Sequence, residues 1–335
     1  MRKSYSCAFA VVAFLALVVS LPAQQSPINP KAVALLRWYP ANLTASFAIE
    51  YPRALAFDGV NMWVASSSSN TITVNKLRAS DGANLGTFSF PYCCAVGGVA
   101  FDGANIWVAH TLGPFFTNVA VTKLRASDGA NLGSFVIGGV EDDMAGSVVF
   151  DGANIWVVSA WSEHPRTDIT KLRASDGTVL DEFSIGEYYS GATGLAFDGT
   201  YIWVASYSFV NSFVFKLRAS DGTIVGSFLT GQDPAGVTFD GTNVWVANNG
   251  SNTVTKLRAS DGANLGTFAV GSNPQNVAFD GANIWVTNWG DGTVSKLRAS
   301  DGANLGTFAV GGDPNGVAFD GANIWVTNSG TVSKM

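Results

Sequence analysis

Charged, sulfur-containing and helix-favouring side chains are scarce in this chain of 335 residues. Only 13% of the residues are charged whereas 47% are hydrophobic, and this composition excludes an intrinsically disordered chain. Three cysteines are too few for a disulfide-stabilised scaffold, so the fold depends on a hydrophobic core. In place of Lys, Glu, Gln and Met the chain is rich in Val, Thr, Asn, Asp and Gly, which is typical of an all-β protein with many turns.

Motifs of common enzymes and of nucleotide-binding proteins are missing. The chain has no Gly-x-Ser-x-Gly, no His-Glu-x-x-His and no phosphate-binding loop, and its two histidines are His110 and His164. The formal net charge is −6, and no basic patch is present. Because an acidic chain repels phosphate backbones, nucleic acid is excluded as a partner.

The one long apolar run lies at the N-terminus. A basic start, apolar residues from Cys7 to Leu21 and a small residue at Ala23 predict a signal peptide over residues 1–23. A membrane anchor is the alternative, but the run is short for a span. We therefore expect an exported protein (periplasmic, cell-surface or secreted) with no membrane span once the signal is removed. Loss of two basic residues with the signal leaves 17 Lys and Arg against 25 Asp and Glu, a net charge of −8.

Two motifs recur along the rest of the chain. Phe-Asp-Gly-x-x-(Ile/Val/Met)-Trp-Val occurs seven times at intervals of 40 to 49 residues, beginning at Phe57, Phe101, Phe150, Phe197, Phe239, Phe279 and Phe319. Lys-Leu-Arg-Ala-Ser-Asp-Gly occurs six times, beginning at Lys76, Lys123, Lys171, Lys216, Lys256 and Lys296. Repeats of this length, each with four short apolar runs, indicate a β-propeller.

The sixth repeat illustrates the strand pattern. Residues 276–279, 284–287, 293–298 and 305–310 are its expected strands A, B, C and D, with Asp-Gly turns after A and C. We therefore predict an all-β fold, a seven-bladed β-propeller over residues 43–335 with four antiparallel strands per blade, preceded by a lead-in segment over residues 24–42. An open β-solenoid is the alternative, although solenoid coils are usually shorter than these repeats.

The two ends of the predicted propeller complement each other. The last repeat supplies strands at 317–319, 324–327 and 331–335 but lacks strand D. Residues 43–48 resemble strand D of the sixth repeat and precede the first strand A. We predict that this N-terminal strand completes the last blade, because closure removes the exposed edges of an open array.

The repeats resemble known propeller families. Trp285-Val286-Thr287-Asn288 and its counterpart at 325–328 resemble the Tyr-Val-Thr-Asn repeat of YVTN-type propellers, and residues 316–321 are similar to NHL and streptogramin-lyase repeats. The resemblance covers residues 43–335 and implies the fold, whereas such propellers include lyases, lactonases and binding modules. Streptogramin lyases are expected to carry His after the loop Pro and Glu at the end of strand B. This chain departs from that pattern with Ala235, Gln275 and Asn315, then Asn248, Asn288 and Asn328.

Loop lengths vary on one face of the predicted ring. The A–B and C–D turns are constant in length, whereas the B–C and D–A connections differ, and binding residues commonly lie on such loops. The repeated Asp are expected to cap their turns, the repeated Trp to pack between blades, and the Lys and Arg of Lys-Leu-Arg to pair with turn Asp residues. The variable face should attract cations, because it carries Glu50, Glu141, Asp142, Asp143, Glu163, Asp168, Glu187, Asp233, Asp291 and Asp313.

Candidate binding residues lie on these variable loops. Glu141, Asp142 and Asp143 enter the third blade and supply the oxygen ligands that Ca²⁺ takes, with solvated acids as the alternative; no other cofactor is expected. Aromatic side chains there indicate contact with a ligand or partner, or packing among the loops, and they are Trp161, Tyr188, Tyr189 and Trp289.

Cys93 and Cys94 are adjacent in the D–A segment between the first two blades. A vicinal disulfide, two free thiols and bonds to another molecule all stay open, since adjacent Cα atoms lie closer than a relaxed disulfide prefers.

Two hypotheses about function follow. The first is a monomeric binding or interaction module whose acidic loop face takes a small molecule, a cation or a protein. The second is a lactonase-like or streptogramin-lyase-like hydrolase or lyase on the blade 2–4 side of the channel mouth. His110 and His164, both expected on B–C loops, would act there together with Glu163.

Overall fold

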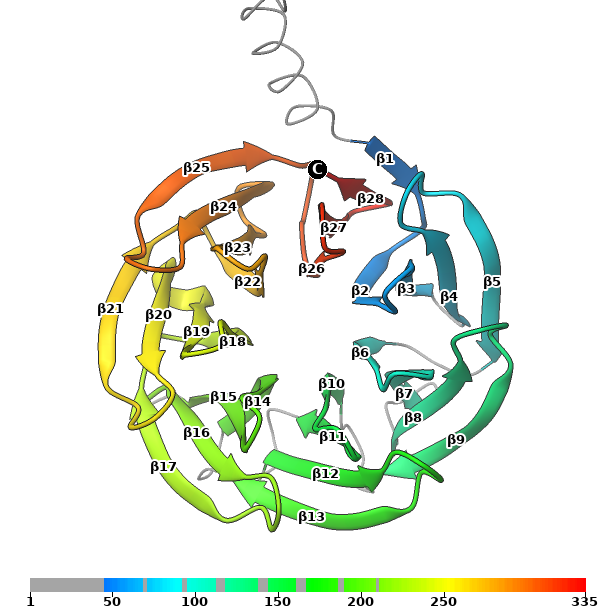
Figure 1. The fold of residues 1–335 in the computed structure, drawn as a ribbon, viewed down its shortest axis with the longest axis horizontal. Coiled ribbons are helices and arrows are strands. Elements are labelled where there is room, and N and C mark those ends of the chain that lie inside the picture. The colour runs from blue at the N-terminus through cyan, green and yellow to red at the C-terminus, as the bar shows by residue number, and fades with distance from the viewer. Residues whose placement is uncertain are drawn as a thin grey trace, which may run out of the picture. The chain divides into compact units, whose positions relative to one another are not determined.

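The computed structural model describes residues 45–68, 71–91, 95–112, 118–137, 144–160, 167–185, 190–208 and 211–335. These residues form seven four-stranded antiparallel sheets arranged around one axis (Figure 1). The protein is thus a seven-bladed β-propeller, as the repeats predict. In each blade strand A lies beside the axis, and strands B, C and D follow outward (Figure 1).

The blades follow one another along the chain, each running through its strands in the order A to D. Blades 1 and 2 are β2 (Pro52–Phe57), β3 (Asn61–Ser68), β4 (Thr71–Arg78), β5 (Asn84–Pro91), and β6 (Val96–Phe101), β7 (Asn105–Leu112), β8 (Asn118–Arg125), β9 (Asn131–Ile137). Blades 3 and 4 are β10 (Met144–Phe150), β11 (Asn154–Ala160), β12 (Thr167–Arg173), β13 (Val179–Ile185), and β14 (Ser190–Phe197), β15 (Tyr201–Ser208), β16 (Phe213–Arg218), β17 (Ile224–Leu229).

Blades 5 and 6 are the most regular pair. They are β18 (Pro234–Phe239), β19 (Asn243–Asn248), β20 (Thr253–Arg258), β21 (Asn264–Ala269), and β22 (Pro274–Phe279), β23 (Asn283–Asn288), β24 (Thr293–Arg298), β25 (Asn304–Ala309). A 3-10 turn, η2 (Asn249–Ser251), follows strand B of blade 5.

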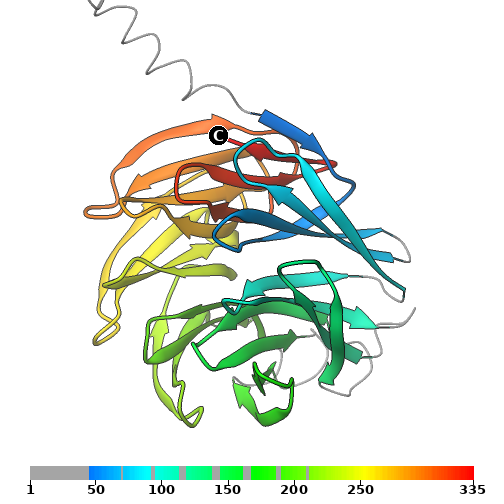
Figure 2. The ribbon, with the colours of Figure 1, turned by 45° about the vertical axis from the view of Figure 1, so that its right-hand side comes forward.

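Blade 7 combines both ends of the propeller. Its strands A, B and C are β26 (Val317–Phe319), β27 (Ile324–Asn328) and β28 (Thr331–Lys334), and its strand D is β1 (Ala45–Ala48). β1 pairs antiparallel with β28, from Ala45 opposite Lys334 to Ala48 opposite Thr331 (Figure 2). The predicted closure by the N-terminal strand is confirmed; residues 43 and 44 of the predicted strand lie outside the described residues.

The Phe-Asp-Gly motif builds the A–B turn and fixes the tryptophan. In blade 2, Asp102 Oδ1 accepts hydrogen bonds from the backbone N–H groups of Ala104 and Asn105, and its Oδ2 accepts one from Trp107 Nε1 at 2.7 Å. The Asp–Trp bond recurs in all seven blades at 2.7–2.8 Å. The carboxylate therefore caps its turn, as predicted, and also satisfies the one polar atom of a large buried side chain.

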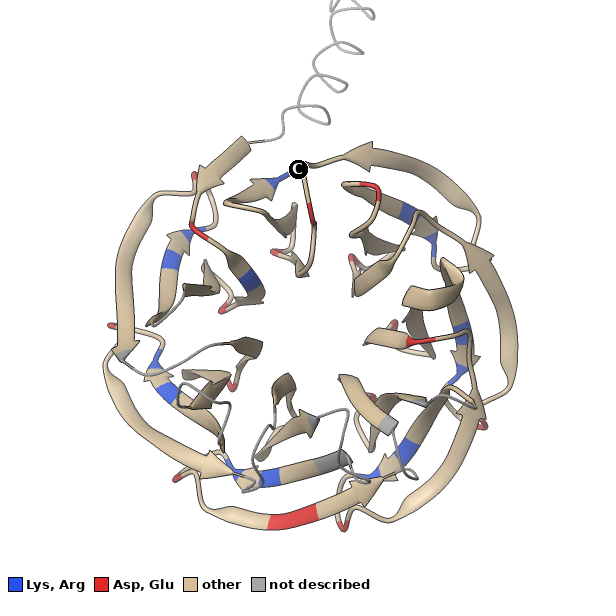
Figure 3. Cartoon of the chain, turned by 180° about the vertical axis from the view of Figure 1, so that it is seen from behind, with Lys and Arg blue, Asp and Glu red and all other residues tan. Residues whose placement is uncertain are grey.

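The Lys-Leu-Arg motif links each blade to the next. Each Arg pairs with the Asp three residues later in its own C–D turn, at 2.8–3.0 Å, as predicted (Figure 3). The same prediction is wrong for Lys. Lys123 Nζ lies 5.0 Å from the centre of the Trp107 ring and donates to the carbonyls of Ala174 and Ser175 in the C–D turn of blade 3.

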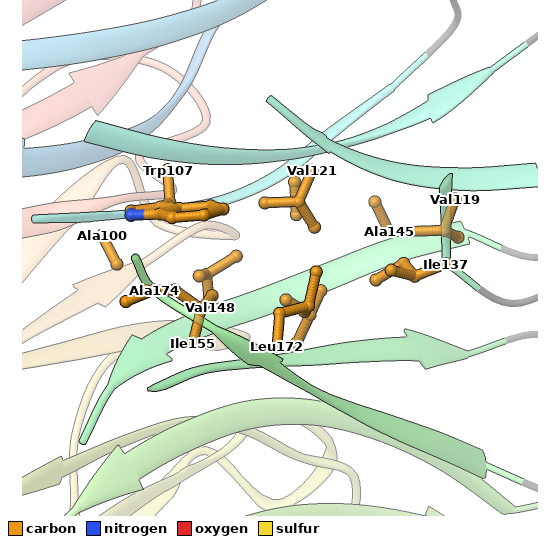
Figure 4. Packing of buried hydrophobic residues seen from close by; sticks show 12 residues of the cluster. Ala100, Trp107, Val119, Val121, Ile137, Ala145, Val148, Ile155, Leu172 and Ala174 are labelled. Carbon is orange, nitrogen blue, oxygen red and sulfur yellow. The ribbon is translucent and has the colours of Figure 1, made fainter. Parts of the chain in front are cut away.

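Hydrophobic side chains fill the spaces between blades. Seven clusters of buried residues occupy the seven interfaces, and six of the seven repeated Trp are 0% exposed. Between blades 2 and 3, Trp107 and Val121 from one blade pack against Val148, Ile155 and Leu172 from the other (Figure 4). The predicted role of the Trp in packing between blades is confirmed.

The interface between blades 6 and 7, called the seam below, lacks one component. Strand D of blade 7 is the N-terminal strand β1, so among the described residues no C–D turn follows β28 to cover blade 6. Among the described residues, Lys296 has no carbonyl partner and only overlies Trp285 at 4.7 Å. Trp285 is 9% exposed, and Phe308 is 36% exposed. The buried cluster at the seam comprises five described residues, the fewest of the seven clusters.

Candidate functional site

A ring of buried polar side chains lies three residues after each repeated Trp, near the end of strand B. The seven residues are at most 3% exposed and are Ser66, His110, Ser159, Ser206, Asn248, Asn288 and Asn328. Several bond to hydroxyl groups of strand C: Asn248 Nδ2 donates to Thr255 Oγ1 at 2.9 Å, and Asn288 Nδ2 donates to Ser295 Oγ at 2.9 Å. These bonds lie within single blades and hold strands B and C together.

His110 belongs to this ring, so its predicted place on a B–C loop is wrong. It lies within β7, paired with Ala120 of β8, and its Nε2 is 2.8 Å from Thr122 Oγ1. Among the described residues, Nδ1 has no hydrogen-bond partner. Burial lowers the pKa of His110 to about 4, so the imidazole is neutral at physiological pH. The prediction ended strand B too soon after Trp107, whereas β7 continues through His110 to Leu112.

A cavity lies in the central channel, between the A strands of the blades. It has a volume of about 420 Å³ and is lined by the first residues of the seven A strands, together with Tyr207 near the end of β15. Strand A begins where the D–A connection enters and strand B ends where the B–C loop leaves. The cavity therefore lies in the part of the channel nearer the face that carries the variable loops.

A β-bulge shapes the channel wall. In six blades the A strand carries an extra residue within its first residues, for example between Pro234 and Val237 opposite Asn248 and Val246. Bulges turn side chains out of the regular alternation and recur beside functional sites. Here the bulge lies at the residues that line the channel.

The channel positions are those at which the repeats differ. Every blade has Val or Leu two residues before the Phe of Phe-Asp-Gly, whereas the pair of residues before that Val or Leu is not the same in any two blades, although its second member is Gly in four of them. The pairs are Arg53-Ala54, Gly97-Gly98, Gly146-Ser147, Thr193-Gly194, Ala235-Gly236, Gln275-Asn276 and Asn315-Gly316. Loop length alone does not reveal these positions, and the sequence analysis names only Ala235, Gln275 and Asn315 among them, as departures from the lyase pattern rather than as binding residues. The difference between otherwise similar repeats was the signal that could have found them.

Arg53 is the charged member of this set. No Asp, Glu, His or Cys is among the described residues that line the cavity. The remaining polar lining comes from the amides of Gln275, Asn276 and Asn315 and from hydroxyl groups on the blade 3–4 side. The Thr193 hydroxyl already donates to the carbonyl of Pro234 at 2.7 Å. The wall can therefore donate hydrogen bonds and carries one positive charge.

Tyr207 stands on the blade 4 side of the cavity. Burial, with a smaller contribution from the charge of Asp233, raises the pKa of its phenol above the ordinary value of 10. The hydroxyl group is therefore neutral at physiological pH and can donate or accept a hydrogen bond.

The predicted binding residues fall mostly beyond the described chain. Glu141, Asp142, Asp143, Trp161, Glu163, His164, Tyr188, Tyr189, Cys93 and Cys94 lie outside the described residues. Trp289 follows β23 and is 43% exposed, but it does not line the channel.

Two acids of the variable face that the structure describes each bond to a neighbouring loop of the same face. Asp291 Oδ2 accepts a hydrogen bond from the backbone N–H of Ser272 at 2.6 Å, and Asp313 Oδ2 accepts one from Ser329 Oγ at 2.9 Å. Glu50, Asp233, Asp291 and Asp313 are not part of the channel wall.

A search of the described residues finds no group of three His, Cys, Asp or Glu side chains placed to hold a metal ion. In the same residues no helix is long and apolar enough to span a membrane.

No protein-family model matches the chain, and a search of curated proteins finds no match to it.

Proposed function

We propose that this protein is a binding module that takes a small molecule at the variable-loop end of its central channel. The observation that carries the proposal is the coincidence of the cavity with the positions at which the repeats differ. Residues that build the blades repeat almost unchanged, whereas Arg53, Gln275, Asn276 and Asn315 each occur in one blade. The strand B residues that also vary between blades are buried within their blades, whereas these four residues line the cavity.

The chemistry of the wall supports binding. A volume of about 420 Å³ falls within the usual range for small-molecule sites. Glycine and alanine at several bulge positions leave the backbone close to any occupant, and the amide and hydroxyl groups supply hydrogen bonds that select it. The fold itself suits an interaction module or an enzyme scaffold. No observation of the described residues favours the hydrolase or lyase alternative, since His110 is enclosed in blade 2 rather than facing the channel.

Two further parts of the proposal derive from the sequence. The basic and apolar N-terminus supports export of the chain after removal of residues 1–23. The Trp-Val-Thr-Asn and Phe-Asp-Gly motifs support kinship with YVTN and NHL propellers, among which binding modules are common.

The test blocks the channel without disturbing the blades. Ala235→Trp fills the cavity from β18, and Leu265→Trp adds the same side chain to exposed strand D of the same blade. The probe is a panel of small organic acids, their amides, monosaccharides and nucleosides, measured by saturation-transfer NMR on the mature chain. We expect at least one compound to bind the wild type and Leu265→Trp but not Ala235→Trp. Binding that Ala235→Trp leaves intact, or no binding by any compound, would overturn the proposal.

A further inference from the structure

Arg53 differs from every other arginine that the structure describes. The other six, in the Lys-Leu-Arg motifs, each form an ion pair with an Asp of their own turn. Arg53 forms no ion pair with any described residue. It is exposed to the channel that it lines, and no described carboxylate shares that wall. A cation without a carboxylate partner among the described residues of this concave wall creates a positive potential inside the cavity.

The backbone around Arg53 is held firmly. Its carbonyl accepts a hydrogen bond from Thr327 Oγ1 of blade 7 at 3.2 Å, and the same hydroxyl accepts one from the N–H of Gly316 at 2.7 Å. Next to Gly316, the N–H of Asn315 donates to the carbonyl of Thr327 at 2.9 Å. Of these bonds, the one from Thr327 to Arg53 crosses the blade 7–1 interface, and it places the backbone of Arg53 beside that of Asn315 and Gly316 in the channel wall.

We infer that the ligand of the channel is a small carboxylic acid whose carboxylate binds Arg53, with the neighbouring amide of Asn315 as a second donor. A planar guanidinium matches a carboxylate with two parallel hydrogen bonds. One cation neutralises one negative charge, so a monoanion fits the described wall better than a phosphate dianion, which would need a second cation.

The far side of the cavity suits the rest of such a molecule. Blade 1, which carries Arg53, lies across the ring from blade 4, which carries Thr193 and Tyr207 (Figure 1). Tyr207 is a neutral phenol, so it provides no charge to pair with a second charged group of the ligand. Its hydroxyl can form a hydrogen bond with a hydroxyl or carbonyl group. The ligand class is thus an acid with an uncharged polar group at its other end.

This inference rests on the proposed function, and its test separates the two. The probes are matched pairs of acid and primary amide, including benzoate with benzamide, nicotinate with nicotinamide, and 4-hydroxybenzoate with its amide. Titrations by NMR use the mature wild-type chain, Arg53→Gln, and Arg78→Gln as a control that removes a paired arginine elsewhere in blade 1. Circular dichroism and melting temperature establish that each variant is folded.

We expect at least one acid to bind wild type about tenfold or more tightly than its amide, because hydrogen bonds to charged groups are the stronger ones. Arg53→Gln should remove that preference, while Arg78→Gln should retain it. Acids and amides that bind equally, or a preference that survives in Arg53→Gln, would overturn the carboxylate assignment while leaving channel binding intact. If inorganic phosphate displaced the acids with higher affinity than any of them, the monoanion assignment would be wrong. If Ala235→Trp still bound every acid and amide that the wild type binds, the proposed function would fail as well.

Discussion

At the scale of residues, one position near the end of strand B accepts three different side chains. Ser, His and Asn all occupy it, and each is almost fully buried. What they share is a polar atom within reach of a hydroxyl group on strand C, as in the pairs Ser66–Thr73, His110–Thr122 and Asn248–Thr255. Because a buried polar atom without a partner is costly, the strand C hydroxyl restricts the choice at this position to hydrogen-bonding residues. Of the three residue types, only histidine can change its protonation state at mildly acidic pH.

Stability at mildly acidic pH should depend on His110. Its folded-state pKa is about 4 against an ordinary value of 6.5, so the unfolded chain binds the proton first. Its contribution is complete above pH 6.5 and declines as the pH falls toward 4. We compare the free energy of unfolding of His110→Asn with that of wild type at pH 7.5 and at pH 5. Between these two pH values the variant should gain about 2 kcal/mol relative to wild type. Urea unfolding followed by Trp fluorescence at both pH values measures this gain. All other residues are common to the two proteins, so equal pH dependence of the two would contradict the prediction.

At the scale of elements, the C–D turn of one blade serves as a lid on the previous blade. Two consecutive carbonyls of the turn accept hydrogen bonds from the Lys of the previous blade, at 2.6–2.7 Å and 3.0–3.3 Å. The turn glycine lies against the strand D Phe of that blade, so closely that a Cβ at Gly129 would overlap the ring of Phe88. Gly129 also has a φ of +76°, which L-residues rarely adopt.

A pair of glycine variants separates packing from backbone strain. Gly103 in the A–B turn of blade 2 has a φ of +97°, but a Cβ there meets no atom within 4 Å. We expect Gly103→Ala to lower the free energy of unfolding by about 1–2 kcal/mol through strain. Gly129→Ala should lower it by a further 1–3 kcal/mol or so, because the methyl group must displace Phe88. Chemical denaturation of the two variants measures both effects, and equal losses would show that the contact between blades contributes little.

A pair of lysine variants tests the lid itself. Lys256 donates to Ala299 and Ser300 of blade 6, whereas Lys296 at the seam has no such acceptors among the described residues. Lys256→Met leaves two carbonyls without a donor, and we expect a loss of about 2 kcal/mol or more. Lys296→Met removes only the contact with Trp285 and should cost less than about 1 kcal/mol. The prediction fails if the two variants lose the same unfolding free energy.

At the scale of the whole molecule, closure of the ring depends on a short strand. β1 has four residues, and one of them, Phe47, stacks on Trp325 with ring centres 5.5 Å apart. Phe47 also contacts the turn at Gly82 of blade 1, so it joins blades 7 and 1. Closure thus depends on two contacts between the ends of the propeller, the pairing of β1 with β28 and the stacking of Phe47 on Trp325.

Phe47 and Phe308 occupy the same position of strand D in blades 7 and 6, but only Phe47 is covered by a following turn. We expect Phe47→Ala to cost about 2–3 kcal/mol and to lower the melting temperature by several degrees. Phe308 is 36% exposed at the seam. We expect Phe308→Ala to lose less than half as much unfolding free energy as Phe47→Ala. Differential scanning calorimetry of the two variants measures the difference, and a larger loss for Phe308→Ala would contradict this account of closure.

The sequence was enough to predict the repeated parts of the fold. Blade number, strand order, turn capping by Asp and closure by residues before the first blade all follow from periodic patterns. The partners of the repeated Lys were not predictable, because Ala174 and Ser175 lie in the next blade and offer backbone carbonyls rather than charges. The channel residues were missed for a related reason. Arg53 and Asn315 are far apart in sequence, and only the closure of blade 7 onto blade 1 brings both into the same wall.

The pairing of β1 with β28 also determines how the ring responds to mechanical load. Ala45, where β1 begins, lies opposite Lys334, where β28 ends, so both ends of the propeller emerge at the same end of one strand pair. Tension applied between them loads the hydrogen bonds one after another, as in a zipper, rather than all at once in shear. Blade 7 should therefore open at low force by losing β1, while the six blades formed from continuous chain keep their sheets. In a propeller held by its two ends, the β1–β28 pair would therefore be the first contact to break under tension.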